Sequence, residues 1–310
     1  MPGVEVDNLG KRFGTVEAVR GISLRIREGE AFGLLGPNGA GKTTTLSMLS
    51  TLLPPSYGDA RIFDRSLTAD VRHVRQLIGL VPQDVSVYPD LTGRENLVFF
   101  GRIYGVPDRQ LRQRADELLA SVGLTARADE RVATYSGGMK RRLNLACGLV
   151  HAPRLLLLDE PTVGVDPQSR HHILTAIRDI AAQGTTVLYT THYMEEAERV
   201  CDRIAIMDEG RIVADGTLAE LLAIVGIGEV IEIRGELLAG DAARLRAIRD
   251  VNRVETTQRL TRIFVTDAGR ALAPIAAIIA ERAGAIENLE MHPVNLERVF
   301  MHLTGKALRD

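Results

Sequence analysis

One stretch near the N-terminus constrains the whole chain: residues 36–43 match the pattern G-x-x-x-x-G-K-[ST]. Residues 30–35 before it are short and apolar, as a buried strand would be, and residues 43–53 after it contain no glycine or proline, which suits a helix. A strand, a loop and a helix form the context in which this pattern marks a phosphate-binding loop. A glycine-rich turn ahead of an ordinary helix is the alternative, and the flanking segments favour the phosphate loop.

The residue types of this loop suit an anion. Glycines let the backbone N–H groups point inward, and the N-terminus of the following helix adds partial positive charge. We expect Lys42 to reach the β- and γ-phosphates of a nucleotide and the Thr43 hydroxyl to hold Mg²⁺. The residues expected to contact the nucleotide here are Gly36, Pro37, Asn38, Gly39, Ala40, Gly41, Lys42, Thr43 and Thr44.

Bulk properties limit the partners and the compartment. The 310 residues, 45% hydrophobic and 25% charged, have an ordinary globular composition and favour two domains over one. A net charge of −2 gives no electrostatic case for nucleic acid as a partner. Cys147 and Cys201 lie far apart without metal or redox spacing, which predicts buried thiols in a reducing compartment. No signal peptide and no membrane-spanning run is visible, so we expect a cytoplasmic protein unless another chain holds it at a membrane.

Two carboxylates follow a second apolar run. Residues 155–158 are four leucines, typical of a central strand covered on both faces, and Asp159 and Glu160 come directly after them. Open α/β sheets bind ligands at the carboxyl ends of their strands. Because a buried carboxylate without a partner is costly, a cation or a catalytic duty is favoured over a helix cap or a surface pair.

A third candidate opens a helix with Ser136, Gly137 and Gly138. The serine can act as the N-cap. Each glycine costs about 1 kcal/mol relative to alanine in a helix, so two together suggest that something approaches the backbone closely.

Other polar residues follow predicted strands. Gln83 comes after a strand at 77–81, His192 after a strand at 185–190, and Asp166 precedes Pro167 as a helix N-cap. Phe13 is expected in a loop ahead of the phosphate loop, where its position alone favours a small-core role. Taken singly, His192 and Gln83 would be a structural histidine and a plain loop residue.

The organisation predicts an ATP-binding domain at 1–222 and a second domain at 229–310, with a change of pattern near Gly226 and Gly228. In the first domain, turns are expected at Leu9–Gly10, Arg20–Gly21 and Glu28–Gly29. Residues 84–151 have helical character. The order β-α-β-β-α-β after residue 229 predicts a small α+β, ferredoxin-like domain.

Together these motifs resemble the ATP-binding subunit of ABC transporters over about residues 4–220, and look most similar to the ATPases of daunorubicin-resistance (ABC-2 type) exporters. The resemblance implies a P-loop NTPase fold with a mixed-sheet core, an antiparallel β subdomain and an α-helical subdomain. Its motifs correspond to Walker A at 36–43, the Q-loop at Gln83, the signature at 136–138, Walker B at 155–160, the D-loop at Asp166 and the switch histidine at His192.

The resemblance further implies a Mg²⁺-dependent ATPase that works as a homodimer, each ATP lying between Walker A of one chain and the signature of the other. The three predicted roles are catalysis by Glu160, His192 and Lys42, Mg²⁺ binding by Thr43, Gln83 and Asp159, and nucleotide contacts by Phe13, the phosphate loop, Gln83, Ser136, Gly137, Gly138 and Asp166. Tyr135 and Met139 depart from the usual Leu-Ser-Gly-Gly-Gln signature, and Val165 from the usual D-loop leucine. The contacts of the missing glutamine are therefore in doubt.

A separate transmembrane permease is the implied partner, with drugs or lipophilic molecules as cargo for export and the inner face of the cell membrane as the location. The stretch from Val87 to Tyr104 either docks a permease helix or forms the core of the helical subdomain. One rival class is a soluble ABC ATPase acting on DNA or ribosomes, which usually has two ATPase halves or a coiled-coil insertion. A GTPase or small-molecule kinase is a second rival, and the chain has no Asn-Lys-x-Asp motif for guanine.

Overall fold

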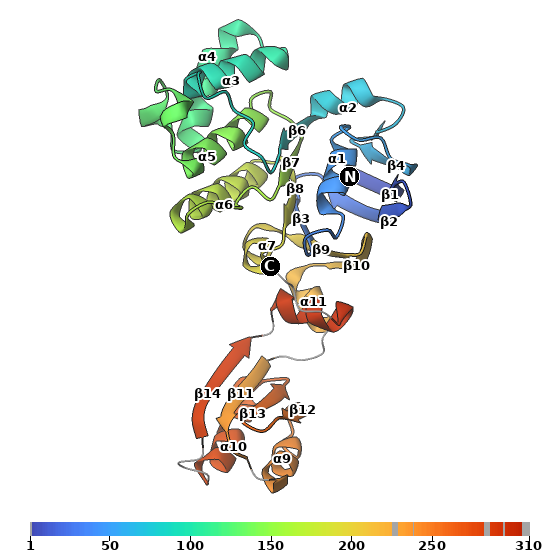
Figure 1. Cartoon of the computed structure of the whole chain (residues 1–310), viewed down its shortest axis with the longest axis vertical. Helices are drawn as coiled ribbons and strands as arrows, with labels where there is room; N and C mark the ends of the chain where they lie inside the picture. Colours follow the sequence, from blue (N-terminus) through green and yellow to red (C-terminus); the bar gives the residue numbers. More distant parts are fainter. Residues whose placement is uncertain (1, 225–228, 238, 282–285, 294, 306–310) are drawn as a thin grey trace. The chain divides into compact units, whose positions relative to one another are not determined.

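The computed structural model describes residues 2–224, 229–237, 239–281, 286–293 and 295–305. The chain divides into two compact units, one ending at Asp215 and the other running from Gly216 to Leu308 (Figure 1). Residues 225–228, which include the predicted change of pattern at Gly226 and Gly228, lie outside the described ranges. Each unit is considered by itself.

A six-stranded sheet forms the centre of the first unit, in the order β10-β9-β3-β8-β7-β6. Its strands are β3 (Ala31–Leu35), β6 (Ile78–Val81), β7 (Leu155–Asp159), β8 (Thr186–Thr191), β9 (Arg203–Asp208) and β10 (Arg211–Gly216). β3 pairs in parallel with β8 and β9, and β7 pairs in parallel with β6 and β8. The carboxyl ends of β3, β7 and β8 therefore lie along one edge of the sheet, where the segments after these strands meet.

Apolar side chains cover this sheet on both faces. Leu155 and Leu157 of β7 pack into one hydrophobic cluster, whereas Leu156 and Leu158 pack into another. β3, β7 and β8 are buried along their whole length. The continuous apolar run at 155–158 thus reports burial on both faces, as the sequence predicts.

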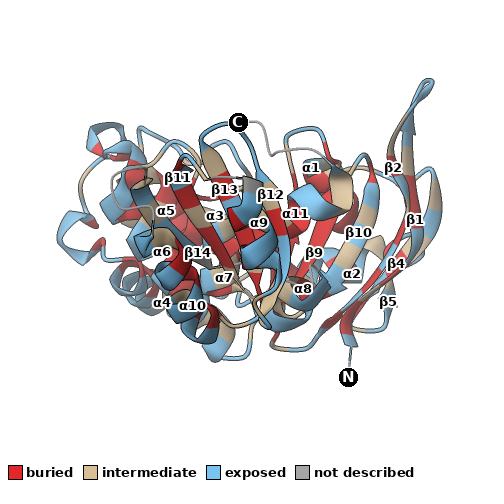
Figure 2. Cartoon of the chain, turned by 90° about the horizontal axis from the view of Figure 1, so that it is seen from below, coloured by how far each residue is buried: buried red, intermediate tan, exposed pale blue. Residues whose placement is uncertain are grey.

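An antiparallel sheet in the order β2-β1-β4-β5 completes the strands of this unit: β1 (Pro2–Phe13), β2 (Val16–Arg27), β4 (Tyr57–Ile62) and β5 (Arg65–Ser66). Buried and exposed residues alternate along most of β2 (Figure 2). The predicted turn at Glu28–Gly29 is present. Those expected at Leu9–Gly10 and Arg20–Gly21 are wrong, because both strands continue through them. Phe13 likewise ends β1 instead of lying in a loop.

The helices of the first unit are α1 (Lys42–Leu49), α2 (Val71–Leu77), α3 (Gly93–Ile103), α4 (Asp108–Ser121), α5 (Gly137–Gly148), α6 (Pro167–Ala182) and α7 (Met194–Val200). The region 84–151 holds α3, α4 and α5, which lie together in Figure 1. α4 buries Leu111, Ala115, Leu118 and Leu119 on one face, at the helical spacing seen in the sequence.

The second unit combines antiparallel strands and helices. It contains α8 (Leu218–Ile224), β11 (Glu229–Gly235), α9 (Ala239–Arg246), β12 (Val251–Thr256), β13 (Leu260–Val265), α10 (Ala268–Ala280), β14 (Ile286–Pro293) and α11 (Leu296–Thr304). The strands pair antiparallel in the order β12-β13-β11-β14. From β11 to β14 the elements follow one another as β-α-β-β-α-β, the succession that the sequence predicts.

Candidate functional site

The phosphate loop joins β3 to α1 and depends on its glycines. A Cβ atom at Gly36 would lie 2.2 Å from the carbonyl oxygen of Met207, and Gly39 and Gly41 have φ angles of +81° and +108°. These are conformations that glycine adopts without strain. No side chain caps α1, whose hydrogen bonds begin with the Thr45 N–H donating to the Gly41 oxygen at 2.9 Å. The preceding N–H groups at this helix N-terminus can therefore face an anion.

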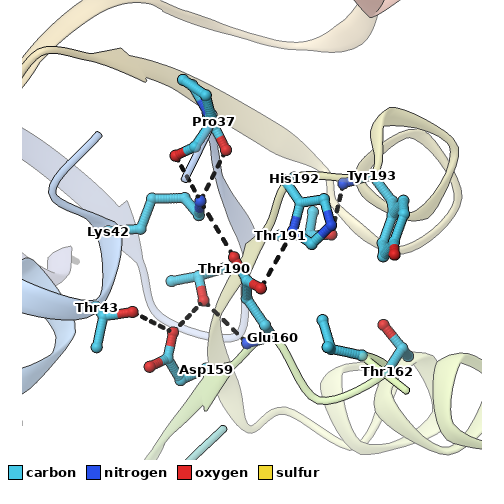
Figure 3. Close-up of polar contacts among 12 residues, drawn as sticks. Pro37, Lys42, Thr43, Asp159, Glu160, Thr162, Thr190, Thr191, His192 and Tyr193 are labelled. Carbon is cyan, nitrogen blue, oxygen red and sulfur yellow. Dashed lines mark hydrogen bonds and ion pairs between the residues drawn. The ribbon is translucent and has the colours of Figure 1, made fainter. Parts of the chain in front are cut away.

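Lys42 is buried at the start of α1 and points into the loop. Its Nζ donates to the carbonyl oxygens of Gly36 and Pro37 at 2.7 and 3.0 Å. It also forms an ion pair with Oε1 of Glu160 at 3.1 Å (Figure 3). Burial lowers the pKa of Lys42, and the charge of Glu160 opposes this shift. The facing carboxylate thus stabilises the ammonium form in a site where little solvent reaches it.

Asp159 ends β7 and contacts two hydroxyls. Its Oδ1 accepts hydrogen bonds from Thr43 at 3.2 Å and from Thr190 at 2.7 Å. Burial raises the pKa of Asp159, whereas the two hydroxyls favour its charged form. A hydroxyl and a carboxylate side by side are oxygen ligands of the kind that Mg²⁺ takes in proteins.

Glu160 connects the ends of three strands. Its Oε2 lies 3.1 Å from Nδ1 of His192, just past β8, while its Oε1 faces Lys42, after β3 (Figure 3). Its backbone has φ of +43°, an uncommon value for a residue with a side chain. The Glu160 N–H donates to the carbonyl oxygen and to Oγ1 of Thr190, at 3.2 and 3.1 Å, which holds this conformation. The carboxylate is therefore aimed at two nitrogens from different segments.

Other predicted residues lie apart from this cluster. Gln83 is exposed on the loop after β6, and Phe13 is 49% exposed at the end of β1. Over the described ranges, no hydrogen bond or ion pair links the Gln83 side chain, Phe13 or residues 136–138 to the phosphate loop. One chain thus brings together Lys42, Thr43, Asp159, Glu160 and His192, and leaves the other predicted contacts unmade.

Two helix N-termini lie side by side elsewhere in the unit. Ser136 caps α5 by accepting from the Met139 N–H at 3.2 Å, and Asp166 caps α6 by accepting from the Ser169 N–H at 2.9 Å. The Ser169 hydrogen bonds lower the pKa of Asp166. A Cβ atom at Gly138 would lie 2.0 Å from Oγ of Ser169. The close approach expected at the glycine pair is therefore made by α6 of the same chain, at Gly138.

Gly137 differs from its neighbour. A Cβ atom there would meet nothing within 4 Å, and both Ser136 and Gly137 are exposed. Packing within the described chain thus gives no reason for glycine at this position. The surface at Ser136 and Gly137 is therefore open.

Two polar residues of the site were missed by the sequence reasoning. Thr190 contacts both Asp159 and Glu160, yet it reads as one more residue of a buried strand. Arg141, 8% exposed in α5, donates to the carbonyl oxygens of Gln83 and of Val163, the latter at 3.1 Å. It joins the loop after β6 to the loop after β7. A basic run in a predicted helix gave no signal of this contact.

The fold and this geometry define a class. A buried strand, a glycine loop and a helix, with a lysine, a threonine and two carboxylates at one sheet edge, are the marks of a P-loop nucleotide-binding protein. Residues 19–163 match the family model described as "ABC transporter". With the relatives described next, this shows that the chain belongs to the ATP-binding proteins of ABC transporters.

Similar proteins match along the full length of the chain. The linearmycin resistance ATP-binding protein LnrL of Bacillus subtilis (strain 168) is 41% identical, covering 99% of this chain and all of the relative. A Nod factor export ATP-binding protein I of Paraburkholderia xenovorans (strain LB400) is 42% identical over 99% of this chain and 98% of the relative. The daunorubicin resistance ATP-binding protein DrrA3 of Streptomyces coeruleorubidus is 41% identical, with 99% and 97% covered.

Solved structures match about 70% of the chain. An ATP-binding subunit of an ABC transporter has a TM-score of 0.66 and 30% identity, and the match covers 72% of this chain and 93% of that one. A dimeric ATP-binding cassette in a post-hydrolysis state, bound to ADP and Pi, has a TM-score of 0.63 and 27% identity over 69% of this chain and 98% of its own. The ABC ATPase fold therefore accounts for about 70% of the chain.

Proposed function

We propose that this chain is the ATP-hydrolysing subunit that powers export of a drug or another lipophilic molecule through a separate permease. The observation that carries the proposal is the convergence of Lys42, Glu160 and His192, beside the Asp159–Thr43 pair. The relatives are named for linearmycin resistance, Nod factor export and daunorubicin resistance, which supports export over the rival action on DNA or ribosomes.

The side chains divide the chemistry among themselves. Lys42 and the N–H groups at the start of α1 bind the phosphates, and Glu160 orients the attacking water and accepts its proton. His192, hydrogen-bonded to Glu160, would contact the γ-phosphate in this proposal. Phosphoryl transfer needs little more from a protein than positioning and charge stabilisation, and these groups supply both.

The donor set at Asp159 fits a hard cation. Thr43 and Asp159 would hold Mg²⁺, and the exposed Gln83 would join them from the loop after β6. Bound there, the ion would neutralise charge on the phosphate oxygens. Removing it with a chelator is expected to abolish hydrolysis.

A second copy of the chain completes the site in this proposal. Ser136, Gly137 and Asp166 of one copy face the nucleotide held by the phosphate loop of the other, and Phe13 stacks on the adenine ring. The exposure of Ser136 and Gly137, together with the dimeric structure of a related cassette, supports this arrangement. The ATP-binding domain is proposed to comprise residues 1–222, with a ferredoxin-like domain at 229–310.

The exposed aromatic side chains of α3 and of the segment before it suit a permease. Tyr88 contacts Phe99 with ring centroids 4.7 Å apart, and the two are 47% and 37% exposed. Ile103, one turn along α3, is 63% exposed, whereas Leu97 of the same helix is fully buried in the core. None of the described helices has the length and hydropathy needed to cross a bilayer. We infer that this face docks a membrane subunit and holds the chain at the inner face of the cell membrane.

Nucleotide binding by the phosphate loop is tested by Lys42→Ala. The variant is expected to lose ATP binding, measured with a fluorescent ATP analogue, because it removes the cation buried in the loop. Arg72→Ala, an exposed cation of α2, is the matched control and should bind as the wild type does. Tight ATP binding by Lys42→Ala would remove the central assignment.

Docking is tested by Phe99→Glu in co-purification with the permease of the same transporter. A charge on this face is expected to abolish co-purification of the two proteins and to leave the basal ATPase rate of the isolated chain within about two-fold, because α3 lies apart from the reacting groups. Loss of both properties together would argue that Phe99 belongs to the core of the helical subdomain instead.

A further inference from the structure

Glu196 is a buried carboxylate in α7 that the mechanism above does not use. Only 3% of the residue is exposed. Its Oε2 accepts hydrogen bonds from the hydroxyls of Tyr189 at 2.7 Å, Thr162 at 2.9 Å and Thr191 at 2.9 Å. Burying a charge is costly unless hydrogen bonds and an opposite charge compensate, so three hydroxyls on one oxygen form a built arrangement.

The donors come from both sides of the reacting groups. Thr162 lies in the loop between Glu160 and Asp166, two residues after Glu160. Thr191 directly precedes His192 at the end of β8. Glu196 thus fastens the loop that carries Glu160 to the turn that carries His192.

The turn around His192 is held on its other side as well. The Tyr193 N–H donates to Oγ1 of Thr191 at 2.9 Å (Figure 3). This hydroxyl therefore accepts from the turn while it donates to Glu196. The rings of Tyr193 and His192 have centroids 4.1 Å apart. Both neighbours of His192 are therefore fixed in place.

Arg170 closes the network from α6. Its Nε lies 3.5 Å from Oε1 of Glu196, and its guanidinium lies 5.0 Å from the ring centroid of Tyr193. Asp166 caps the same helix one turn earlier. The charge of Glu196 is thereby balanced by a cation that also touches the His192 turn.

Tyr189 is an unusual donor for the interior of a parallel strand. It is fully buried in β8, and burial raises the pKa of its phenol well above the ordinary value. The phenol therefore stays protonated and donates to Glu196 throughout the neutral range.

We propose that Glu196 is a positioning residue for the ATP hydrolysis proposed above, on which this inference rests. It sets the distance between the His192 turn and the loop of Glu160 through Thr191 and Thr162. It does not touch the nucleotide. Its loss displaces His192 relative to Glu160, and leaves the phosphate loop and the affinity for ATP intact.

The test is Glu196→Gln in the full-length chain. A glutamine keeps the size but has no charge for Arg170. We expect kcat to fall about 10- to 100-fold, since a misplacement of about 1 Å can cost about 10²-fold, with KM for ATP within about three-fold of the wild type. Glu195→Gln is the matched control: the same change, one position earlier in α7, on an exposed residue. It should leave both constants unchanged.

A mutant cycle separates positioning from folding. Thr162→Val removes one hydrogen-bond donor to Glu196. If both residues act through this contact, the fold-decrease in kcat of Thr162→Val combined with Glu196→Gln should be much smaller than the product of the two single fold-decreases. When Thr162→Val is combined with the control Glu195→Gln, the fold-decreases in kcat of the two single variants should multiply. Melting temperatures check the fold, and if Glu196→Gln does not fold, Tyr189→Phe takes its place in the same cycle.

Different results would overturn the proposed ATPase function and the positioning role of Glu196. A wild-type chain that hydrolyses no ATP overturns the proposed function itself. An active wild type in which Glu196→Gln has a wild-type kcat per nucleotide-binding molecule overturns the positioning role, even when its melting temperature falls. Multiplicative losses in the cycle with Thr162→Val also overturn it.

Discussion

Asp159 and Glu160 are adjacent carboxylates with different surroundings. Asp159 accepts from two hydroxyls, those of Thr43 and Thr190, whereas Glu160 faces the nitrogens of Lys42 and His192. The positive φ of Glu160 ends the alternation of β7 and turns the second carboxylate toward a different set of partners. Strain of this kind persists where the surrounding structure holds it, and it is common at functional sites. A cation site and a general base can thus occupy consecutive residues.

Asp159→Asn is expected to raise the melting temperature by a few degrees at pH 7.5 in metal-free buffer. Because burial raises the pKa of Asp159, the folded chain holds this proton more tightly than the unfolded chain does. The carboxyl therefore destabilises the fold increasingly as the pH rises above its unfolded pKa, about 3.9. Asparagine removes this ionisation and keeps an acceptor for the two hydroxyls.

Melting curves of both proteins at pH 7.5 and near pH 4.5 provide the check. The gain in melting temperature should shrink at the lower pH, where the penalty for the charged form is smaller. An equal gain at both pH values would show that the effect comes from packing and not from ionisation. Added Mg²⁺ should stabilise the wild type more than the variant, since the ion binds the carboxylate.

At the scale of elements, the start of α5 has two glycines with different reasons for being glycine. Gly138 packs against Ser169 of α6, where a Cβ atom would come within 2.0 Å of Oγ. Gly137 has open space around it and lies exposed beside the capping Ser136. Sequence alone treats them as one pair. The structure assigns the first to packing between α5 and α6, and leaves the second without an internal cause.

This difference predicts opposite effects of the same substitution. Gly138→Ala should destabilise the fold by about 1–3 kcal/mol, the usual cost of overpacking, measured by denaturant unfolding. Gly137→Ala should leave stability equal or slightly higher, because alanine favours helices, yet lower the ATPase rate by placing a methyl group where the second copy's nucleotide binds. If Gly137→Ala kept full turnover, the signature would not face a nucleotide.

Strand and helix boundaries followed from the sequence where local pattern decides them. The phosphate loop, the strand at 155–158 and the succession of elements from β11 to β14 agree with the prediction. The predicted bounds of β1 and β2 are wrong, because a glycine within each strand indicates a turn when only the sequence is considered. Gly10 lies under the ring of Tyr57 and Gly21 has φ of +66°, at irregularities in the β1–β2 pairing. A glycine in a strand can mark a bulge or a close contact as well as a turn, and only the pairing partner decides.

The sequence predicts the motif residues of the site but not the residues that hold them in place. Lys42, Asp159 and Glu160 stand in local patterns that name their chemistry. Arg141 contacts Val163, and Glu196 contacts Thr162, each more than 20 residues away in the sequence; only the contacts of Glu196 with β8 are local. Each of the two is one charged residue among several in its helix. Their importance comes from burial and from the facing carbonyls and hydroxyls. Neither property is visible in one sequence.

At the scale of the whole molecule, the phosphate loop is half of a nucleotide site in this account. Within the described chain, residues 136–138 make no polar link to residues 36–44, and their outward-facing end is open. A related cassette is dimeric with ADP and Pi bound. Two copies related by a two-fold axis would pair each phosphate loop with a signature, and so place two nucleotides in one interface.

The most direct measurement is the mass of the Glu160→Gln protein in solution with ATP and Mg²⁺, by size exclusion with light scattering. Without its general base the variant should hydrolyse ATP about 10²- to 10⁴-fold more slowly, and so accumulate as an ATP-bound dimer. Adding Ser136→Arg should return it to a monomer that still binds ATP, because only the signature face has changed. A Glu160→Gln protein that stays monomeric with bound ATP, or that turns over ATP at the wild-type rate, would contradict the account.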